Sequence, residues 1–450
     1  MKMKRIASGL LLTLIAAGAL TGCNDRQEAA TQKTPEETEA TTTAVEETTT
    51  EETTVTEEPE ETTTEPQALT HELVVDTMFD EHANDYRTFA LKLASQCASS
   101  NDQNILVSPA SALFALEMAA SGAAGLTLEE IAQVIIPNAT PEQIQKFTVQ
   151  YMDSFDGDYF SLANAIWIDN AYTNAIYDDY KSYLQDYYGA EIAYGELSDA
   201  TQIINDWIKE KTKGRIPALL DDGDLGPSTV QVLVNAITFD ATWYAEFPEE
   251  AIYTGDFTNY GGSTSEVSYM NGFAEVYFET ENATGFIKDY ENDDYVFMAI
   301  LPDDEKISAN DYLASLTPED FDAILSSRSY SGANVKMPEF KSDYRTELTT
   351  SLYAMGIDKA FNSAEADFSA AGNFEPGSGI HISSVIQQAT ITVDHKGTEA
   401  AVATAVMEED ACEIDEPEEI KSVELTRPFV YIIMDLETRT PIFAGTINNM

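Results

Sequence analysis

Apolar residues recur at helical spacing in several stretches between about residue 80 and residue 215. The runs TFALKLASQCA (88–98), SALFALEMAASGA (111–123) and TQIINDWIKEKTKGRI (201–216) each place apolar side chains three and four positions apart, which predicts amphipathic helices. Pro109 suits the first turn of the second helix, directly after a Ser108 N-cap. Gly214 predicts the end of the third helix.

Beyond residue 215 the pattern changes to short runs rich in β-branched and aromatic residues, which predict strands. The runs are VQVLVNAITF (230–239), EVYFE (275–279), YVFMAILP (295–302), ANVKMPEF (333–340), SVIQQATITVD (384–394), PFVYIIMD (428–435) and PIFAGTI (441–447). Helices first and strands afterwards, without regular alternation, indicate the α+β class with a mainly antiparallel sheet.

The N-terminal residues have a different pattern, which is typical of a targeting segment. Residues 1–5 are basic, residues 6–20 are apolar, and Leu-Thr-Gly-Cys ends at Cys23. The apolar stretch is short for a membrane span and has the form of a signal peptide. The last four residues resemble the cleavage box of bacterial lipoproteins, so we expect a signal peptide over 1–22 and lipidation of Cys23. The alternative is an ordinary signal peptide with an incidental cysteine.

Residues 23–70 follow this segment and consist largely of threonine and glutamate. Such a stretch cannot bury a core, so we expect a disordered linker that holds a domain away from a surface. A dedicated binding tail is the alternative. From residue 71 to residue 450 the sequence has no second low-complexity linker and no internal repeat, which indicates one domain.

Charge and motif content exclude several classes of function. The formal net charge of the 450 residues is -55, which argues against nucleic acid as a partner and favours cationic partners. None of the four histidines has metal-ligand spacing to another His or Cys, and the common hydrolase, metalloprotease and nucleotide-binding motifs are absent. We therefore expect no enzyme, no metal and no cofactor. Cys97 and Cys412 could pair in an exported protein, but Cys97 lies in an apolar helical pattern and Cys412 in an acidic stretch, so we expect two free thiols. No CxxC motif indicates a redox or zinc site.

Five segments from about residue 80 to the end resemble the serpin family, in the family's order. They are NILVSPASALFALEMAASGAAGLTLEEI (104–131), INDWIKEKTKGRI (204–216), LVNAITFDATWYAEF (233–247), LYAMGIDKAFNSAEADFSA (352–370) and RPFVYIIMDLETRTPIFAG (427–445). The resemblance implies a serpin fold, with helices around mainly antiparallel sheets and an exposed reactive-centre loop at about 395–427. It also implies a sheet-opening region made of Ser108, Ser111, Asn235, Trp243 and Gln387.

The run KGTEAAVATAV (396–406) resembles the hinge of the serpin reactive loop. The resemblance assigns hinge positions to Gly397, Thr398, Glu399, Ala400, Ala401, Val402, Ala403 and Thr404. In a strand that begins at Gly397, Thr398, Ala400, Val402 and Thr404 would face the core, while Glu399, Ala401, Ala403 and Ala405 would face outward. The inward side chains are small and uncharged, so such a strand can enter a packed sheet.

This resemblance implies a suicide-substrate inhibitor. A protease cuts the loop, is trapped as an acyl-enzyme, and is carried along when the cut loop enters the main sheet. The family pattern places the cut between Ala411 and Cys412, which suits an elastase-like serine protease. Glu409 and Glu413 are the alternative cut sites, and they would suit a glutamyl-specific enzyme. The acidic residues between 408 and 424 predict faster encounter with a cationic protease.

Two positions depart from the family pattern. Gln387 stands where a histidine is common, and we expect it to bridge Ser111 and Asn235 without any response to pH. His395 stands where glutamate is common, so a salt bridge is not expected there, and we expect an exposed or singly hydrogen-bonded histidine.

Together these features predict a monomer held by a lipid anchor at the extracellular face of a bacterial membrane, where it forms a covalent complex with a secreted serine protease. Two other hypotheses remain open. The first is a non-inhibitory binding protein or adhesin with a serpin fold at the cell surface. The second is a hydrolase without a recognisable motif.

Overall fold

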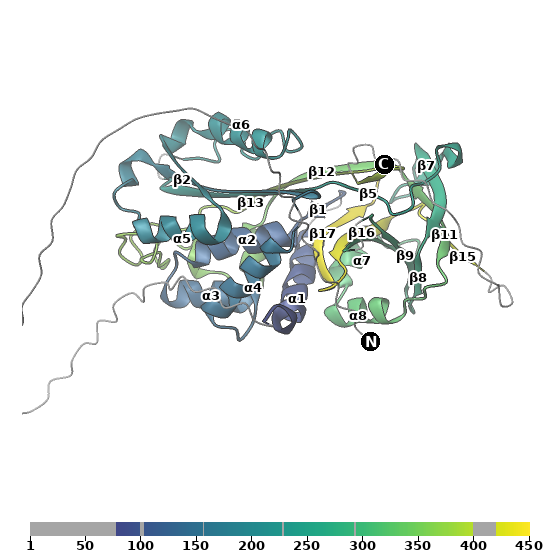
Figure 1. Cartoon of the computed structure of the whole chain (residues 1–450), viewed down its shortest axis with the longest axis horizontal. Helices are drawn as coiled ribbons and strands as arrows, with labels where there is room; N and C mark the ends of the chain where they lie inside the picture. The colour runs from purple at the N-terminus through teal and green to yellow at the C-terminus, as the bar shows by residue number, and fades with distance from the viewer. Residues whose placement is uncertain (1–77, 100–102, 156, 227–228, 292–293, 399–419) are drawn as a thin grey trace, which may run out of the picture. The chain divides into compact units, whose positions relative to one another are not determined.

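The computed structural model describes residues 78–99, 103–155, 157–226, 229–291, 294–398 and 420–450 (Figure 1). The helices are α1 (Met78–Ser99), α2 (Pro109–Ala120), α3 (Gly125–Ile135), α4 (Pro141–Asp153), α5 (Asp178–Tyr188), α6 (Thr201–Lys211), α7 (Ala309–Ser315), α8 (Pro318–Ser326) and α9 (Thr349–Met355). Short 3₁₀ helices are η1 (Asn170–Tyr172), η2 (Leu197–Asp199), η3 (Glu249–Ala251) and η4 (Lys359–Phe361).

The strands lie between and after these helices. They are β1 (Leu106–Val107), β2 (Phe160–Asp169), β3 (Glu191–Gly195), β4 (Gln231–Phe239), β5 (Ala241–Thr242), β6 (Ile252–Thr258), β7 (Thr264–Ala274), β8 (Val276–Glu279), β9 (Ala283–Asp289), β10 (Tyr295–Pro302), β11 (Ala333–Pro338), β12 (Phe340–Glu347), β13 (Ile386–Val393), β14 (Gly397–Thr398), β15 (Lys421–Glu424), β16 (Phe429–Asp435) and β17 (Thr440–Ile447).

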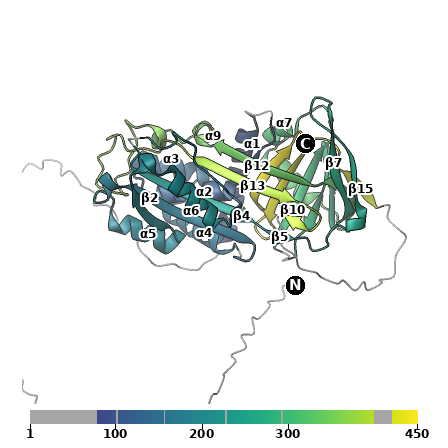
Figure 2. The same ribbon diagram turned by 90° about the horizontal axis from the view of Figure 1, so that it is seen from above.

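The described strands form four sheets whose pairs are antiparallel, except for β2 with β3 and β11 with β15. One sheet has the order β1-β17-β16-β10-β9-β8, and a second has the order β15-β11-β7-β6. The other two are β3-β2-β4 and β12-β13-β14-β5. In space β13 lies beside β4, so these last two form neighbouring halves of one layer (Figure 2). We call them the β4 half-sheet and the β13 half-sheet.

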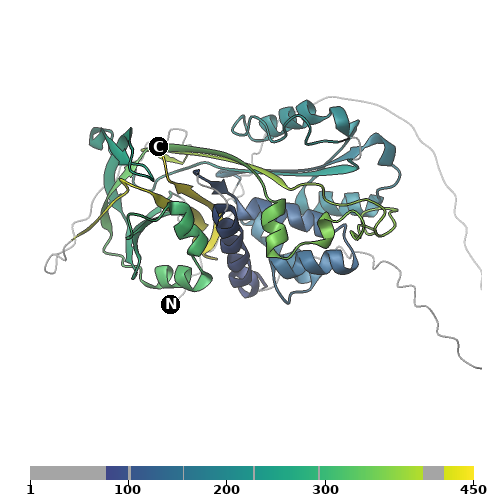
Figure 3. The same ribbon diagram turned by 180° about the vertical axis from the view of Figure 1, so that it is seen from behind.

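Helix α2 lies beneath this layer and is buried along almost its whole length. Ser108 is its N-cap and accepts a hydrogen bond from the Ser111 backbone N–H at 3.2 Å, while Pro109 occupies the first turn. Alanine, leucine and methionine follow, which favour helix and can be buried on every side. On the opposite face α6 lies over the β4 half-sheet (Figures 1 and 3).

The three helices and seven strands predicted from the pattern are present, with two differences in their bounds. The third helix ends at Lys211, before Gly214, and the run 333–340 covers β11 and the first residue of β12, which belong to different sheets. The expected order was partly wrong, since β2 and β3 lie among the first helices and α7, α8 and α9 lie among the later strands. Cys97 is buried in α1 as a free thiol, as expected. Cys412 lies outside the described residues. Within the described part of the chain, no helix combines the length and apolar character needed to cross a membrane.

Candidate functional site

The predicted hinge begins as a short strand inside the β13 half-sheet. Gly397 and Thr398 form β14, which pairs with Val393 of β13 on one side and with β5 on the other. The turn before it is closed by Asp394, whose Oδ1 accepts hydrogen bonds from the Lys396 N–H at 2.8 Å and from the Gly397 N–H at 3.2 Å. The hinge strand has therefore already entered the layer at its first two residues.

Glycine is required at position 397 by close packing. A Cβ atom there would lie 2.7 Å from the Cα atom of Thr242 and would also collide with the carbonyl oxygen of Ala241. Both atoms belong to the backbone of β5, which cannot move aside without breaking its pairing with β14. The absence of a side chain is what lets the hinge strand approach β5 at this point.

Thr398 faces the core and is fully buried, as strand parity predicted. Its Oγ1 atom lies 2.6 Å from the hydroxyl oxygen of Tyr290, and the two groups are hydrogen-bonded. Burial raises the pKa of Tyr290, so its phenol stays protonated. The Tyr290 ring stacks on Trp243, with 4.6 Å between the ring centroids and 10° between the planes.

Trp243 holds the turn that precedes the hinge. Its indole N–H donates to the Asp394 carbonyl at 2.9 Å, and its backbone N–H donates to the Lys396 carbonyl at 2.8 Å. The backbone N–H of Phe247 donates to the His395 carbonyl at 2.9 Å. Three hydrogen bonds from Trp243 and Phe247 thus hold the turn at residues 394–396 in place and fix where the hinge strand starts.

His395 lies between two carboxylates. Its Nδ1 atom is 3.3 Å from Glu339 Oε1, and its Nε2 atom is 3.8 Å from Glu249 Oε1. The histidine has one hydrogen-bonded neighbour, as expected, but it is largely buried and not exposed. Two carboxylates thus lie within 4 Å of the imidazole at a position where no salt bridge was expected from the sequence.

The predicted sheet-opening residues fall into separate contacts. Gln387 makes two hydrogen bonds to Ser108: its Oε1 accepts from the Ser108 N–H, and its Nε2 donates to the Ser108 carbonyl, both at 2.8 Å. The expected bridge from Gln387 to Ser111 and Asn235 is therefore wrong. The reason is that Gln387 reaches the first turn of α2 and pairs with backbone there. Asn235 instead donates to Asn164 Oδ1 at 2.6 Å.

A cavity of about 370 Å³ lies where the two half-sheets meet. Its walls include Val232 and Asn235 of β4, Ile386 and Gln387 of β13, and Ala112 of α2. No ladder joins β4 to β13 among the described strands. Asn235 Oδ1, which is buried, has no hydrogen-bond partner in the described part of the chain. The described strands of the two half-sheets are thus not paired with one another at the cavity between β4 and β13.

Several predicted residues lie outside the described part of the chain. These are Cys23, the hinge positions Glu399, Ala400, Ala401, Val402, Ala403 and Thr404, and the cut-site residues Ala411, Cys412, Glu409 and Glu413. Four residues of the site were missed: Tyr290, Asp394, Glu339 and Glu249. A sequence signal existed only for Asp394, because an Asp three residues before a Gly between two strand patterns predicts a tight turn.

Comparisons with known proteins agree with this architecture. Residues 84–450 match the family model described as Serpin (serine protease inhibitor). An uncharacterized serpin-like protein of Thermococcus kodakarensis is 30% identical over 379 residues, covering 81% of this chain and 85% of that protein. One from Methanosarcina acetivorans is 29% identical over 384 residues, covering 82% and 85%.

Solved structures agree as well. The thermophilic serpin tengpin in its native state is 32% identical, with a TM-score of 0.73 and coverage of 85% of this chain and 96% of tengpin. Tengpin in its latent state is 30% identical, with a TM-score of 0.69 and coverage of 83% and 98%. The chain belongs to the serpin family, and its fold is the serpin fold.

Proposed function

We propose that this serpin inhibits a secreted serine protease as a suicide substrate, by inserting its cut reactive loop between the β4 and β13 half-sheets. The observation that carries the proposal is the buried position of Thr398 in β14. This small uncharged residue is fully buried in a strand that already separates β13 from β5. The later residues that strand parity would place on the same face, Ala400, Val402 and Thr404, are also small and uncharged.

The proposed driving force is the completion of the layer. A strand that continued from β14 would lie between β4 and β13, where the cavity is and where no described ladder joins the two strands. Each new ladder hydrogen bond contributes roughly 1 kcal/mol net, so about a dozen residues would contribute on the order of 10 kcal/mol. Tengpin, solved in native and latent states, is a relative that adopts more than one structure.

The proposed chemistry belongs to the protease. Its serine oxygen attacks the carbonyl carbon of Ala411, an ester forms, and the peptide bond to Cys412 breaks while the serine proton passes through the protease's histidine to the departing amine. Insertion then competes with hydrolysis of the ester by water. An alanine at the cut bond supports an elastase-like target, and Glu409 and Glu413 support a glutamyl-specific one.

The acidic loop is proposed to set the rate of encounter. Glutamate and aspartate dominate the stretch from 408 to 424, with Lys421 as its single basic residue. A cationic protease would be attracted to this loop, and added salt would slow association. Association rates that do not change with ionic strength would contradict this part of the proposal.

The N-terminal residues support a location for the inhibitor. We propose that Cys23 carries lipid and that residues 24–70 tether one serpin domain outside a bacterial membrane. Cells grown with a radiolabelled fatty acid should label the wild-type chain and should not label a Cys23→Ala variant. Equal labelling of the two chains would overturn the anchor without affecting the inhibitory proposal.

The inhibitory proposal is tested by mixing the purified chain with an elastase-like and a glutamyl-specific protease and separating the products on a denaturing gel. A stable band larger than either protein supports inhibition. Cut serpin beside fully active protease would indicate a non-inhibitory binding protein. Sequencing the peptide released during complex formation identifies the cut bond, which the proposal places after Ala411.

A further inference from the structure

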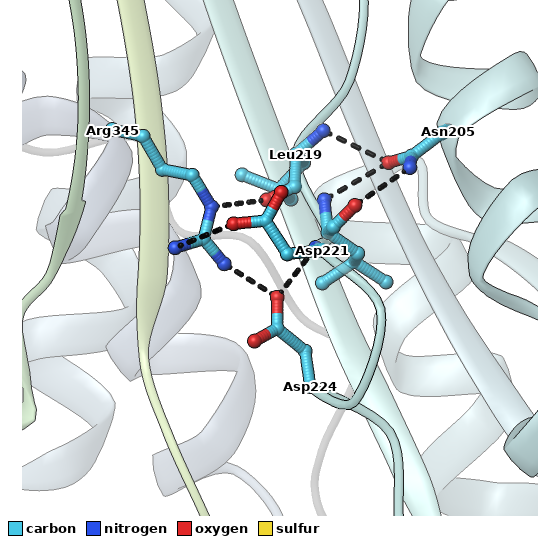
Figure 4. A network of polar contacts seen from close by, with 6 residues as sticks. Asn205, Leu219, Asp221, Asp224 and Arg345 are labelled. Carbon is cyan, nitrogen blue, oxygen red and sulfur yellow. Dashed lines mark hydrogen bonds and ion pairs between the residues drawn. The ribbon is translucent and has the colours of Figure 1, made fainter.

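Arg345 connects β12 to the segment that leads from α6 to β4. Its Nε donates to the Leu219 carbonyl at 3.0 Å, one terminal nitrogen pairs with Asp224 Oδ2, and the other lies 3.5 Å from Asp221 Oδ2 (Figure 4). The Asp221 N–H also donates to Asp224 Oδ2 at 2.7 Å. We call these contacts the Arg345 clasp. The guanidinium thus contacts one backbone carbonyl and two carboxylates in a single short segment.

The same segment is fixed from the other side by α6. The side chain of Asn205, which is buried, accepts from the Leu219 and Leu220 N–H groups at 2.8 and 2.9 Å and donates to the Leu220 carbonyl at 2.8 Å. These three hydrogen bonds all join the Asn205 side chain to the backbone of Leu219 and Leu220 (Figure 4). The segment is consequently held between α6 and β12 and cannot shift without breaking contacts at one end.

The Arg345 clasp spans the two half-sheets. Arg345 pairs with Gln388 in the ladder between β12 and β13, so it belongs to the β13 half-sheet. The segment that contains Asp224 continues into β4 and belongs to the other half. Leu219, Asp224 and Leu225 also line the cavity between the halves. The clasp therefore joins the two halves at the edge of the cavity between β4 and β13.

The Arg345 clasp lies far from the hinge along the strands of the layer. Thr398 pairs with Val393, five ladder positions from Gln388, which corresponds to roughly 17 Å. A new strand would move β13 about 4.8 Å away from β4. An Arg–carboxylate pair does not survive such a displacement unless the segment moves with β13, and the segment is covalently joined to β4.

We propose that the Arg345 clasp is a latch that holds the two half-sheets together and slows the late part of loop insertion. The proposal rests on the proposed inhibitory function, because a latch on insertion has a role only if the cut loop inserts. Opening it removes Arg345 from Asp224 and from the Leu219 carbonyl, groups that are only partly exposed. Weakening the latch speeds insertion, and it also makes the uncut protein less stable.

The test uses the competition between insertion and hydrolysis of the acyl-enzyme as a clock. The full chain and its variants react with the protease that they inhibit, and a gel measures the ratio of covalent complex to cut, released serpin. The hydrolysis rate is a property of the protease, so a change in this ratio reports the insertion rate. Arg345→Gln and Asp224→Asn should each raise the ratio roughly fivefold, the factor expected for one partly buried ion pair.

Two comparisons separate a latch from general loss of stability. Arg87→Gln removes a similar pair, with Asp322 at 2.8 Å between α1 and α8, and should leave the ratio unchanged. Combining Arg345→Gln with Asp224→Asn should give no more than Arg345→Gln alone, because the Arg345 change already breaks the contact with Asp224. If Arg345→Gln does not fold, Asp224→Asn alone carries the test.

The outcomes distinguish the two proposals. If the wild-type chain forms the covalent complex, and both clasp variants show the same ratio of complex to cut serpin or a lower one, the latch is overturned. The inhibitory proposal is unaffected by that result. A ratio that rises equally in the Arg87→Gln variant also overturns the latch. A wild-type chain that forms no complex, and gains no heat resistance when its loop is cut, overturns inhibition and the latch together.

Discussion

The hydroxyl of Tyr290 meets the hydroxyl of Thr398 at 2.6 Å, in a part of the core where both side chains are buried. This contact joins the end of the described hinge to a residue just beyond β9, and Trp243 stacks on the same tyrosine ring. The first inserted residues are thus held by a side-chain anchor in addition to the ladder with β13 and β5.

Tyr290→Phe should destabilise the uncut protein. The change removes one hydrogen bond and leaves the Thr398 hydroxyl buried without its partner, which costs about 1–3 kcal/mol. Urea denaturation measures the loss as a lower midpoint with an unchanged slope. Tyr330→Phe is the matched control, because Tyr330 is 76% exposed. Equal midpoints for the Tyr290 variant and the wild type would contradict the anchor.

Thr398→Arg should convert an inhibitor into a substrate. A charge at this fully buried position cannot enter the layer without a large desolvation cost, so the ratio of complex to cut serpin should fall at least tenfold. Thr264→Arg introduces the same charge at an exposed position of β7 and should have no effect. An unaltered ratio in the Thr398 variant would mean that Thr398 does not face the core during trapping.

Glu117 predicts a pH dependence of stability. Burial beneath the layer raises the pKa of this α2 carboxyl to about 8, so the folded protein keeps a proton that the unfolded chain releases above its ordinary pKa of 4.5. The folded state binds more protons in this window, so the free energy of unfolding falls as the pH rises from 4.5 to 8, by about 1.4 kcal/mol per pH unit from this group.

Glu117→Gln should remove that slope, so the variant should exceed the wild type in stability near pH 8.5 and approach it near pH 4.5. Denaturation midpoints across this range measure the difference. Glu266→Gln, at an exposed position of β7, serves as the control and should follow the wild type. A Glu117→Gln variant that keeps the wild-type slope would show that this carboxyl does not cause it.

Cys97 should be unreactive in the folded protein. Burial in α1 raises the pKa of its thiol to about 11 from an ordinary value of 9.0. At pH 8 this reduces the thiolate fraction roughly a hundredfold. A Cys23→Ser, Cys412→Ser variant isolates Cys97, and its alkylation by iodoacetamide should be slow until denaturant is added. Rapid alkylation of the folded variant would contradict the burial.

Much of the fold followed from local pattern, and much of the site did not. Helix α2 and strand β13 could be predicted because their periodicity and the Ser108-Pro109 start are local signals. The pairing of Tyr290 with Thr398 joins residues 108 positions apart, and no local pattern encodes such a contact. The partners predicted for Gln387 were wrong because several polar groups lie near its side chain. Its amide hydrogen-bonds to the backbone N–H and carbonyl of Ser108 at the start of α2, and sequence alone does not show which group is closest.

The heat stability of the protein before and after its loop is cut tests the central claim most directly. If the severed segment becomes a strand between β4 and β13, the added ladder of on the order of 10 kcal/mol should raise the melting temperature by roughly 10–15 °C, and the Thr398→Arg variant should not gain. A cut wild-type protein that melts at the same temperature as the uncut protein, or lower, would contradict the account.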